Sequence, residues 1–395
     1  MVGGHLEYFM TKPIAIAGAG FSGAVMAREL ADRAGLKVVV YEERDHIAGN
    51  CHSKRDPETG VMEHIYGAHV FHTDREDIWN YVNRFASFRP FHVRIHSVTH
   101  RGVFSLPINL LTLNQFFGRV MSPAEARLHL ETLVDRTKEH PENFEDQALH
   151  LVGREIYEAF FRGYTLKQWG VDPRRLPASI LKRLPIRFNY NNDYFNDRFQ
   201  GIPEEGYTQL IEGILDHPNI ELRLGEGYKP GNEGRFEQVF FSGPLDAFFD
   251  YRLGRLGYRT LRFERFVHVG DFQGNAVITF CEESVPYTRI IEHKHLAPWE
   301  EHEKSLCTRE FSHEAQPGDT PFYPLRLVDD KTLLRAYCEL AEQSRGITFL
   351  GRLGTYRYLD MHQVIGEAID LADRYVKHRG SSEAFPAFSV SPLEI

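Results

Sequence analysis

The spacing of hydrophobic residues changes its period along the chain, and each period predicts a different kind of element. Residues 14–17 and 38–42 are short runs of apolar, largely β-branched residues, which indicates buried strands. Between them, a glycine-rich turn is followed by apolar residues at helical spacing up to about Arg33, and Gly35 ends that segment. A strand, a helix and a strand in this order predict a βαβ unit of the α/β class.

Three later regions have other patterns. Residues 107–181 have mostly helical spacing, and residues 122–125 form a capping box with proline at the first helical position. Residues 189–323 contain β-branched and aromatic runs separated by Gly, Asn and Asp, which predict strands in a mixed or antiparallel sheet. Residues 360–379 have apolar positions four apart and end on basic residues, which predicts a last helix.

The composition narrows the class of protein. With 395 residues, of which 42% are hydrophobic and 26% charged, the chain can bury a large core and is long enough for two or three domains. No apolar run approaches the roughly 20 residues that span a bilayer, and the first residues lack the basic flank and apolar stretch of an export signal. We therefore expect no membrane span and a cytoplasmic location.

Charge and cysteine content exclude further classes. A net charge of -9 argues against a nucleic-acid or anionic-membrane partner, so an anionic ligand would have to be met by a few well-placed arginines. The four cysteines are too few for a disulfide framework and lack the CxxC spacing of a metal site, as expected in a reducing compartment. We expect no bound metal ion.

A dinucleotide fingerprint lies at the first predicted turn. Gly18, Gly20 and Gly23 form a G-x-G-x-x-G pattern between a predicted strand and a predicted helix. Glycines there let the main chain approach a pyrophosphate at the helix N-terminus. Glu42 ends the next strand, where its carboxylate suits a ribose diol. An α/β turn without a ligand is the alternative interpretation.

The fingerprint alone does not separate NAD from FAD. Two later stretches favour FAD: a strand that ends in the small-residue turn Ser242-Gly243, and the turn-then-helix stretch 349–369. Ordinary strand and helix packing would explain either stretch taken alone.

With these features in order, the chain closely resembles the bacterial UDP-galactopyranose mutases. The resemblance spans about residues 13–375 and is carried by the motifs GAGFSGAV, HIAGNCHS, GAHVFHT, GYTLKQWG, RLPIRFNYNNDYF, YRTLRFE, TRIIEHKH and GRLGTYRYLDM. It implies a Rossmann-like FAD-binding domain built from discontinuous segments (1–85, 201–245 and 324–395), a helical domain (100–181) and an antiparallel β-sheet domain (86–99, 182–200 and 246–323).

The resemblance implies an isomerase that interconverts UDP-galactopyranose and UDP-galactofuranose by ring contraction, without net redox change. FAD must be reduced for this activity, because N5 of the reduced flavin is the nucleophile at sugar C1. UDP departs, and a flavin–sugar iminium forms before the ring closes again. The implied partners are the two UDP-sugars, an external reductant such as NAD(P)H, and a second copy of the chain in a homodimer.

The resemblance also assigns roles to individual residues. Arg183 and Arg289 are expected to bind the departing diphosphate, because the planar guanidinium pairs with phosphate oxygens. His72 is expected near the flavin and the sugar, with no proton assigned to it. The implied substrate-binding residues are Phe160, Phe161, Tyr164, Trp169, Tyr194, Tyr323 and Tyr358. The implied cofactor-binding residues are Gly18, Gly20, Phe21, Ser22, Gly23, Glu42, Glu43, Arg44, Asn50, His69, Arg352, Asp360 and Met361.

Other interpretations stay open. Arg183 is alternatively one member of a basic surface cluster, Arg289 an ion pair on a sheet face, and Asp360 only a helix N-cap. His69 and His72 are metal-ligand types, but no carboxylate or cysteine completes a set. For the whole protein, the alternatives are a flavin oxidoreductase of the amine-oxidase kind and an FAD-dependent binding or scaffold protein.

The aromatic stretch 158–170 (EAFFRGYTLKQWG) combines two expectations. Phe160 continues a buried helical stripe and is core on any interpretation. Glycines at both ends of residues 163–170 predict a mobile substrate loop. By the resemblance, Tyr164 in this loop stacks on uracil and Trp169 lies near the substrate. We therefore expect an anchored start followed by a mobile lid.

Overall fold

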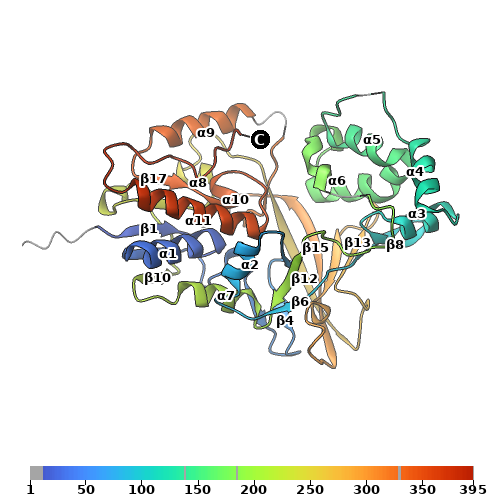
Figure 1. Cartoon of the computed structure of the whole chain (residues 1–395), viewed down its shortest axis with the longest axis horizontal. Coiled ribbons are helices and arrows are strands. Elements are labelled where there is room, and N and C mark those ends of the chain that lie inside the picture. Colours follow the sequence, from blue (N-terminus) through green and yellow to red (C-terminus); the bar gives the residue numbers. More distant parts are fainter. Residues whose placement is uncertain (1–11, 138, 184–185, 328–330, 395) are drawn as a thin grey trace, which may run out of the picture. The chain divides into compact units, whose positions relative to one another are not determined.

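The chain folds into two compact units, each discontinuous in sequence. The computed structural model describes residues 12–137, 139–183, 186–327 and 331–394, without the side chains of Lys182 and Arg183 (Figure 1). Unit 1 contains the residues through Gly49, Ile211–Gly254 and the residues from Arg335 onward. Unit 2 contains Asn50–Leu210 and Arg255–Leu334.

The described part of unit 1 is built on a five-stranded sheet in the order β10-β2-β1-β11-β17. Every pairing in it is parallel, and the central strand β1 is buried along its whole length. Helices α1 and α11 pack against each other beside this sheet (Figure 1). The predicted βαβ unit is confirmed. The elements of unit 1 are β1 (Ile14–Ala17), α1 (Phe21–Ala34), β2 (Val38–Glu42), β10 (Ile220–Leu224), η5 (Glu233–Arg235), β11 (Val239–Phe241), α8 (Leu245–Phe248), β17 (Ile347–Phe349), α10 (Gly351–Gly354) and α11 (Met361–His378).

The described part of unit 2 contains a seven-stranded sheet in the order β16-β12-β15-β14-β13-β7-β8. Its pairings are antiparallel except that of β13 with β7, which is parallel, so the sheet agrees with the mixed or antiparallel sheet predicted from the sequence. Its strands are β7 (Ile95–Thr99), β8 (Gly102–Leu106), β12 (Tyr258–Val269), β13 (Val277–Phe280), β14 (Arg289–Glu292), β15 (Lys304–Glu314) and β16 (Tyr323–Pro324).

Unit 2 also has two smaller sheets, β5-β9-β6 and β3-β4. The histidine-rich segment 64–72 begins at the end of β4 and ends in β5. The other elements of this part are short, and the α-helices α7 and α9 include residues of both units. These elements are η1 (Gly49–Cys51), β3 (Ser53–Arg55), β4 (Met62–His64), β5 (Phe71–Thr73), α2 (Glu76–Val82), β6 (Phe88–Pro90), β9 (Phe199–Pro203), α7 (Gly206–Leu215), η6 (His293–Leu296) and α9 (Lys331–Gln343).

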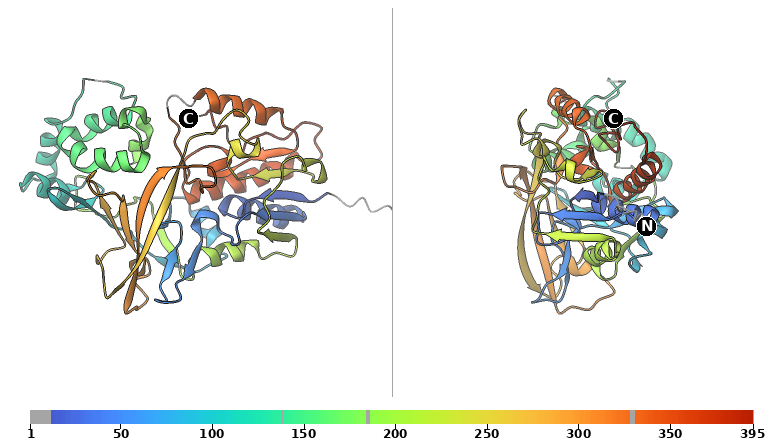
Figure 2. Two further views of the ribbon diagram at one scale, coloured as in Figure 1. Left: turned by 180° about the vertical axis from the view of Figure 1, so that it is seen from behind. Right: turned by 90° about the vertical axis from the view of Figure 1, so that its left-hand side faces the viewer.

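The helical part of unit 2 lies between β8 and β9 in sequence and has a core of its own (Figure 2). Phe104, Phe116 and Phe160 meet in this core at ring-centroid distances of 5.3–5.8 Å. Ser122 caps α4 and Glu125 completes the predicted capping box. The elements are α3 (Leu110–Phe117), α4 (Pro123–Glu131), α5 (Phe144–Ile156), the π-helical turn η2 (Tyr157–Arg162), α6 (Gly163–Trp169), η3 (Pro173–Arg175) and η4 (Ala178–Arg183).

The division into units differs from the expected domain boundaries. Residues 50–85 and 201–210, which we expected in the FAD-binding domain, belong to unit 2. None of the described helices combines the length and the hydrophobicity needed to cross a membrane. The four cysteines are free thiols.

Candidate nucleotide and substrate sites

The glycine fingerprint forms a tightly packed turn between β1 and α1. Gly18 has φ of +100°, and a Cβ there would lie 2.3 Å from Oγ of Ser242, which donates to the Ala17 carbonyl at 2.7 Å. A Cβ on Gly23 would lie 1.9 Å from the Gly18 carbonyl oxygen. The turns after β1 and β11 therefore touch, and only glycine fits at these two positions.

Gly20 is different, because a Cβ there would make only ordinary van der Waals contact. A Cβ on Gly20 would have no neighbour closer than Cα of Gly49 at 3.8 Å. Gly20 is also the N-cap of α1 and supplies no side-chain cap. The buried Phe21 and Ser22 begin the helix. A bare helix N-terminus of this kind suits a pyrophosphate.

Glu42 ends β2 beside this turn and is 6% exposed. Its Oε2 accepts from the Ala19 N–H at 2.8 Å, and its Oε1 accepts from the Arg44 N–H at 3.0 Å. The carboxylate is thus fixed at the carboxyl edge of the sheet, while Glu43 next to it is exposed.

The segment after β17 reaches the same turn. A Cβ on Gly351 would lie 2.2 Å from Oγ of Ser22. Arg352 donates from Nε to the Leu359 carbonyl at 3.1 Å, and its guanidinium lies 5.1 Å from the ring centroid of Tyr358. Asp360 is the N-cap of α11, which begins at Met361, so the N-cap interpretation of Asp360 is confirmed without excluding a cofactor contact.

The centre of the candidate substrate site in unit 2 is the Arg289–Glu310 pair, which lies on facing residues of β14 and β15. Nε of Arg289 donates to Oε2 of Glu310 at 2.7 Å, and Nη2 lies 2.7 Å from the same oxygen. Glu310 is fully buried and the Arg289 side chain is 21% exposed. Burial opposes the charge of Arg289, but the Glu310 carboxylate outweighs it and raises the pKa of Arg289. No described residue hydrogen-bonds to Nη1, which leaves that edge for a ligand.

Three of the predicted tyrosines gather around this pair. The Tyr164 hydroxyl lies within electrostatic range of Arg289 and Glu310, and also of the Tyr194 and Tyr323 hydroxyls. Burial raises the pKa of Tyr164, so its hydroxyl stays protonated and can donate. Trp169 is close to Tyr323, with ring centroids 6.4 Å apart. The structure therefore brings Tyr164, Trp169, Tyr194, Tyr323 and Arg289 together.

His72 joins this group through an aromatic contact. Its ring stacks on Phe195, the neighbour of Tyr194, at a centroid distance of 3.7 Å, and its Nδ1 lies 3.0 Å from Oδ2 of Asp197. His69 faces elsewhere, because its Nδ1 bonds the Gly67 carbonyl at 2.7 Å.

Two further contacts in unit 2 involve the predicted cofactor residue Asn50 and the turn at Gly67. The Asn50 amide donates to the Pro321 carbonyl at 3.4 Å. The turn at Gly67 (φ +98°) packs on Glu310, since a Cβ there would lie 3.4 Å from its Oε2. The GAHVFHT motif thus reaches the carboxylate that orients Arg289.

The segment 163–170 is a helix, so the prediction of a loop is wrong in conformation. Residues 163–169 form α6, and Gly163 has helical φ and ψ. A Cβ on Gly163 would lie 2.2 Å from the Cys281 carbonyl oxygen. Gly170 ends the helix with φ of +69°, and a Cβ there would lie 2.4 Å from Nη1 of Arg259. Both glycines are required for close packing, which the sequence pattern does not distinguish from a hinge.

The two phenylalanines before α6 have separate roles. Phe160 is 3% exposed inside the helical core, which contradicts direct contact of its ring with substrate and confirms it as core. Phe161 is partly buried and lines a small apolar cavity of about 30 Å³ together with Tyr194, Leu106 and Val152. This cavity lies beside the tyrosine group because Tyr194 belongs to both.

Arg183 ends η4, but its side chain lies outside the described residues, so its predicted role stays a prediction. Tyr358 lies in unit 1 and is 38% exposed.

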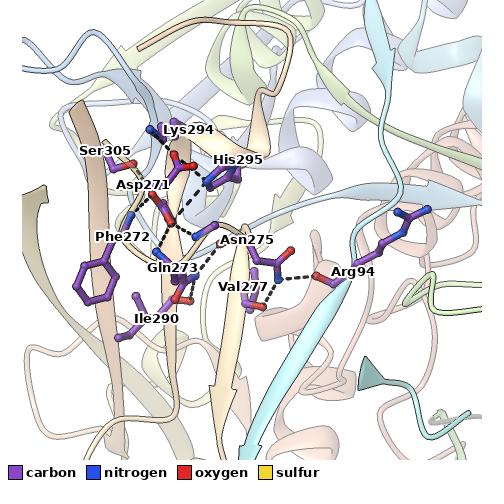
Figure 3. A network of polar contacts seen from close by, with 12 residues as sticks. Arg94, Asp271, Phe272, Gln273, Asn275, Val277, Ile290, Lys294, His295 and Ser305 are labelled. Carbon is purple, nitrogen blue, oxygen red and sulfur yellow. Dashed lines mark hydrogen bonds and ion pairs between the residues drawn. The ribbon is translucent and has the colours of Figure 1, made fainter. Parts of the chain in front are cut away.

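Among the described residues, one group has the composition of a metal site: Asp271, Glu292 and His295. Figure 3 shows Lys294 and His295 pointing toward Asp271, and Nζ of Lys294 lies 2.6 Å from its Oδ1. This lysine holds the pKa of Asp271 below its usual value. The Glu292 carboxylate accepts three main-chain N–H groups, from residues 272 to 274, at 2.8–3.0 Å. Protein cations and donors already satisfy these carboxylates, which argues against a metal there.

Comparison with known proteins assigns this architecture to a family. Residues 16–85 match an NAD(P)-binding Rossmann-like domain, and residues 159–358 match the UDP-galactopyranose mutase family. The chain is 52% identical over 379 residues to a probable UDP-galactopyranose mutase of Klebsiella pneumoniae, covering 96% of this chain and 98% of that protein. This chain belongs to the UDP-galactopyranose mutase family. It is therefore an enzyme, as predicted.

Two further comparisons describe the range of that family. A dTDP-fucopyranose mutase of Escherichia coli is 47% identical over 372 residues, covering 92% of this chain and 98% of that protein. The crystal structure of a reduced UDP-galactopyranose mutase matches with a TM-score of 0.73 at 15% identity, covering 93% of this chain and 94% of the other. The second match supports the fold, and the first shows that relatives differ in nucleotide and sugar.

Sequence reasoning missed three residues that build the site of unit 2: Glu310, Asp197 and Arg259. Each acts on a residue distant in sequence, through a strand register or a turn. Arg259 lies inside the YRTLRFE motif and Asp197 lies two residues after the NYNNDYF motif, so these two were the most open to discovery.

Proposed function

We propose that this protein interconverts UDP-galactopyranose and UDP-galactofuranose with reduced FAD as its cofactor. The observation that supports this most strongly is the free edge of Arg289, which Glu310 orients and which the hydroxyls of Tyr164 and Tyr323 influence electrostatically. A guanidinium held on one side, with hydroxyl donors near it, suits a diphosphate. Family membership supplies the sugar nucleotide that carries it.

The residues of unit 1 fit FAD. The bare N-terminus of α1 would hold the pyrophosphate, and Glu42 would accept from a ribose hydroxyl. Arg352, Asp360 and Met361 would lie along the flavin, as relatives' motifs imply. When bound, reduced flavin supplies the nucleophile for the anomeric carbon of the sugar.

The side chains of unit 2 would handle the nucleotide and its leaving diphosphate. Arg289, and Arg183 with it, would stabilise the charge that develops as the diphosphate departs. Protonated tyrosine hydroxyls would donate to the same oxygens, while Tyr164 and Phe161 would offer aromatic faces to the uracil. An Nδ1–H of His72 would donate to Asp197, which would fix the orientation of the ring beside the sugar.

A second candidate substrate pair has support from the comparisons. The 47% identity to a dTDP-fucopyranose mutase favours testing dTDP-fucose, which differs from UDP-galactose in the base, the ribose 2′-OH and the sugar 6-OH. The homodimer and the external reductant such as NAD(P)H stay predictions from the resemblance.

The test uses the purified flavoprotein reduced with dithionite. UDP-galactofuranose and dTDP-fucofuranose are supplied in parallel reactions, and the pyranose products are separated by chromatography. We expect conversion of UDP-galactofuranose at the higher kcat/KM, and loss of turnover in Arg289→Ala with FAD retained. Faster turnover of the dTDP-sugar would select the second candidate. No conversion of either, together with oxidation of amines, would refute the mutase function.

A further inference from the structure

The ammonium group of Lys167 is enclosed by main-chain carbonyl oxygens. Lys167 lies on α6, and its three N–H groups are shared among four carbonyl oxygens, those of Phe280 at 2.7 Å from Nζ, Glu282 at 2.8 Å, Val285 at 3.0 Å and Tyr287 at 3.0 Å. Phe280 ends β13, and the other three residues lie in the turn that joins β13 to β14. The turn thus wraps around Nζ as a peptide loop wraps around a bound cation.

This carbonyl cage attaches α6 to the turn that immediately precedes Arg289 in the chain. The caged turn ends at Thr288, whose N–H donates to the Glu310 carbonyl at 2.8 Å, and Arg289 follows it. Gly163 allows the first turn of α6 to approach the Cys281 carbonyl, so the helix and the turn meet closely at both Gly163 and Lys167. The spacing of α6 from β14 is therefore set by contacts of the turn.

The other end of α6 is fixed by side chains of β12 and β15. Nε of Arg259 donates to the Gln168 carbonyl at 2.9 Å, and its Nη2 donates to the Lys167 carbonyl at 3.2 Å. Oγ of Ser312 also donates to the Gln168 carbonyl, at 2.6 Å. With the carboxyl end held in this way, Lys167 is the contact that joins the middle of α6 to the turn before Arg289.

We propose that Lys167 is a positioning residue for the nucleotide: its caged ammonium locks Tyr164 and Trp169, on α6, to the strand that carries Arg289. Tyr164 precedes Lys167 by three residues, so both side chains project from nearly the same face of the helix. The inference rests on the proposed function, since it assumes that a nucleotide diphosphate spans Tyr164 and Arg289. Ordering of the turn and binding of the nucleotide are then coupled, each favouring the other.

The first experiment measures the Kd of UDP for the reduced holoenzyme by calorimetry. In Lys167→Met we expect the Kd to rise by about tenfold, because the turn loses its charged partner and Arg289 loses its fixed distance from Tyr164. Lys167→Gln keeps N–H donors without the charge, so its Kd for UDP should lie between those of wild type and Lys167→Met. The matched control is Arg162→Met, since Arg162 pairs with Glu283 of the same turn on the surface, and its Kd should stay within about twofold of wild type.

The second experiment reads the turn itself. Cys281 lies in the turn, is 4% exposed, and its thiol donates to the Phe160 carbonyl at 3.3 Å. In Lys167→Met without ligand, we expect iodoacetamide to label Cys281 about tenfold faster than in wild type, with Cys307 of β15 as the internal control. In wild type, UDP should slow the labelling of Cys281. The labelled peptides are quantified by mass spectrometry.

These outcomes separate this inference from the proposed function. A merely structural lysine would lower the melting temperature but leave the UDP Kd of the folded variant unchanged, and that result would overturn the positioning role alone. If neither variant folds, the wild-type experiment decides, because labelling of Cys281 that UDP does not slow refutes the coupling. A wild-type holoenzyme that does not bind UDP would refute the proposed function and this inference with it.

Discussion

Two stretches of the chain place closely spaced glycines beside a helix, residues 18–23 in unit 1 and residues 163–170 in unit 2. In the first, a Cβ on Gly20, at the N-terminus of α1, would meet only ordinary contact with Gly49 at 3.8 Å. In the second, Gly163 faces the Cys281 carbonyl and Gly170 faces the Arg259 guanidinium. In the second case glycine allows close approach to the protein's own polar groups, whereas at Gly20 no atom of the described residues requires it.

The difference shows what a glycine pair in a sequence can indicate. It indicates that something approaches the main chain closely, and the partner has to be found in the structure. Around α6 the partners are a carbonyl oxygen and a buried arginine, so the glycines allow the helix to pack closely against them. Movement of a lid over the nucleotide is not required for these residues to be glycine.

The largest effect is expected for Gly163→Ala. The new Cβ would lie 2.2 Å from the Cys281 carbonyl oxygen, a main-chain atom that can move only with the whole turn. We expect a loss of about 3 kcal/mol in the free energy of unfolding, measured by urea denaturation. Gly234→Ala is the control, since a Cβ there meets nothing within 4 Å. Wild-type stability in Gly163→Ala would restore the mobile-loop interpretation.

Gly20→Ala tests the opposite property. A Cβ at Gly20 has room, so we expect the melting temperature of the apoprotein to be unchanged. The methyl group would occupy the space for the pyrophosphate, and we expect FAD affinity to fall about a hundredfold, equal to about 2.7 kcal/mol. Fluorescence titration of the apoprotein with FAD measures this. If FAD affinity is retained, the phosphate does not lie against Gly20.

Glu310→Gln tests whether UDP binding in unit 2 depends on the orientation of Arg289. The amide keeps an acceptor for Arg289 but removes the charge that holds it, so we expect the Kd of UDP to rise by about tenfold with little change in fold. Glu264→Gln is the control, because Glu264 pairs with Arg262 on the exposed part of β12. Equal effects in the two variants would contradict a special role for Glu310.

The smallest effect near neutrality is expected from two buried histidines of unit 2. Burial lowers the pKa of His293 to about 3 and that of His64 well below its usual value. The unfolded chain, with a pKa near 6.5, binds more protons, so stability falls as pH falls below this value. Between pH 7 and pH 6 we expect a loss of about 0.7 kcal/mol per histidine. Urea denaturation at both pH values measures it, and His293→Gln should reduce the loss by about 0.7 kcal/mol.

The sequence was most informative where function depends on neighbours along the chain. Gly18, Gly23 and Glu42 belong to one βαβ unit, and their turn could be predicted because the strand, turn and helix signals are adjacent. Ser122 and Glu125 were predictable for the same reason. The resemblance then placed Arg289 and the tyrosines, which periodicity alone would have left as sheet and core residues.

The remaining features depend on register between distant segments. Glu310 meets Arg289 because β14 and β15 pair at that residue, and no local pattern sets that alignment. Lys167 meets carbonyls more than 110 residues later in the chain. The helix at 163–169 was not predicted, because its glycines are needed for close packing against the Cys281 carbonyl and Arg259, and the sequence does not show these contacts.

The interrupted course of unit 1 also governs the order in which the protein can be made. Ala15 of β1 lies opposite Val239 of β11, and Val239 lies opposite Ile347 of β17. During synthesis, β1 therefore cannot pair with β11 until most of unit 2 has been made. The Gly351 turn, which closes on Ser22, comes later still. With the proposed cofactor site at this turn, cofactor binding is expected only near the end of translation or after release, and nascent chains that end before residue 347 should carry no flavin.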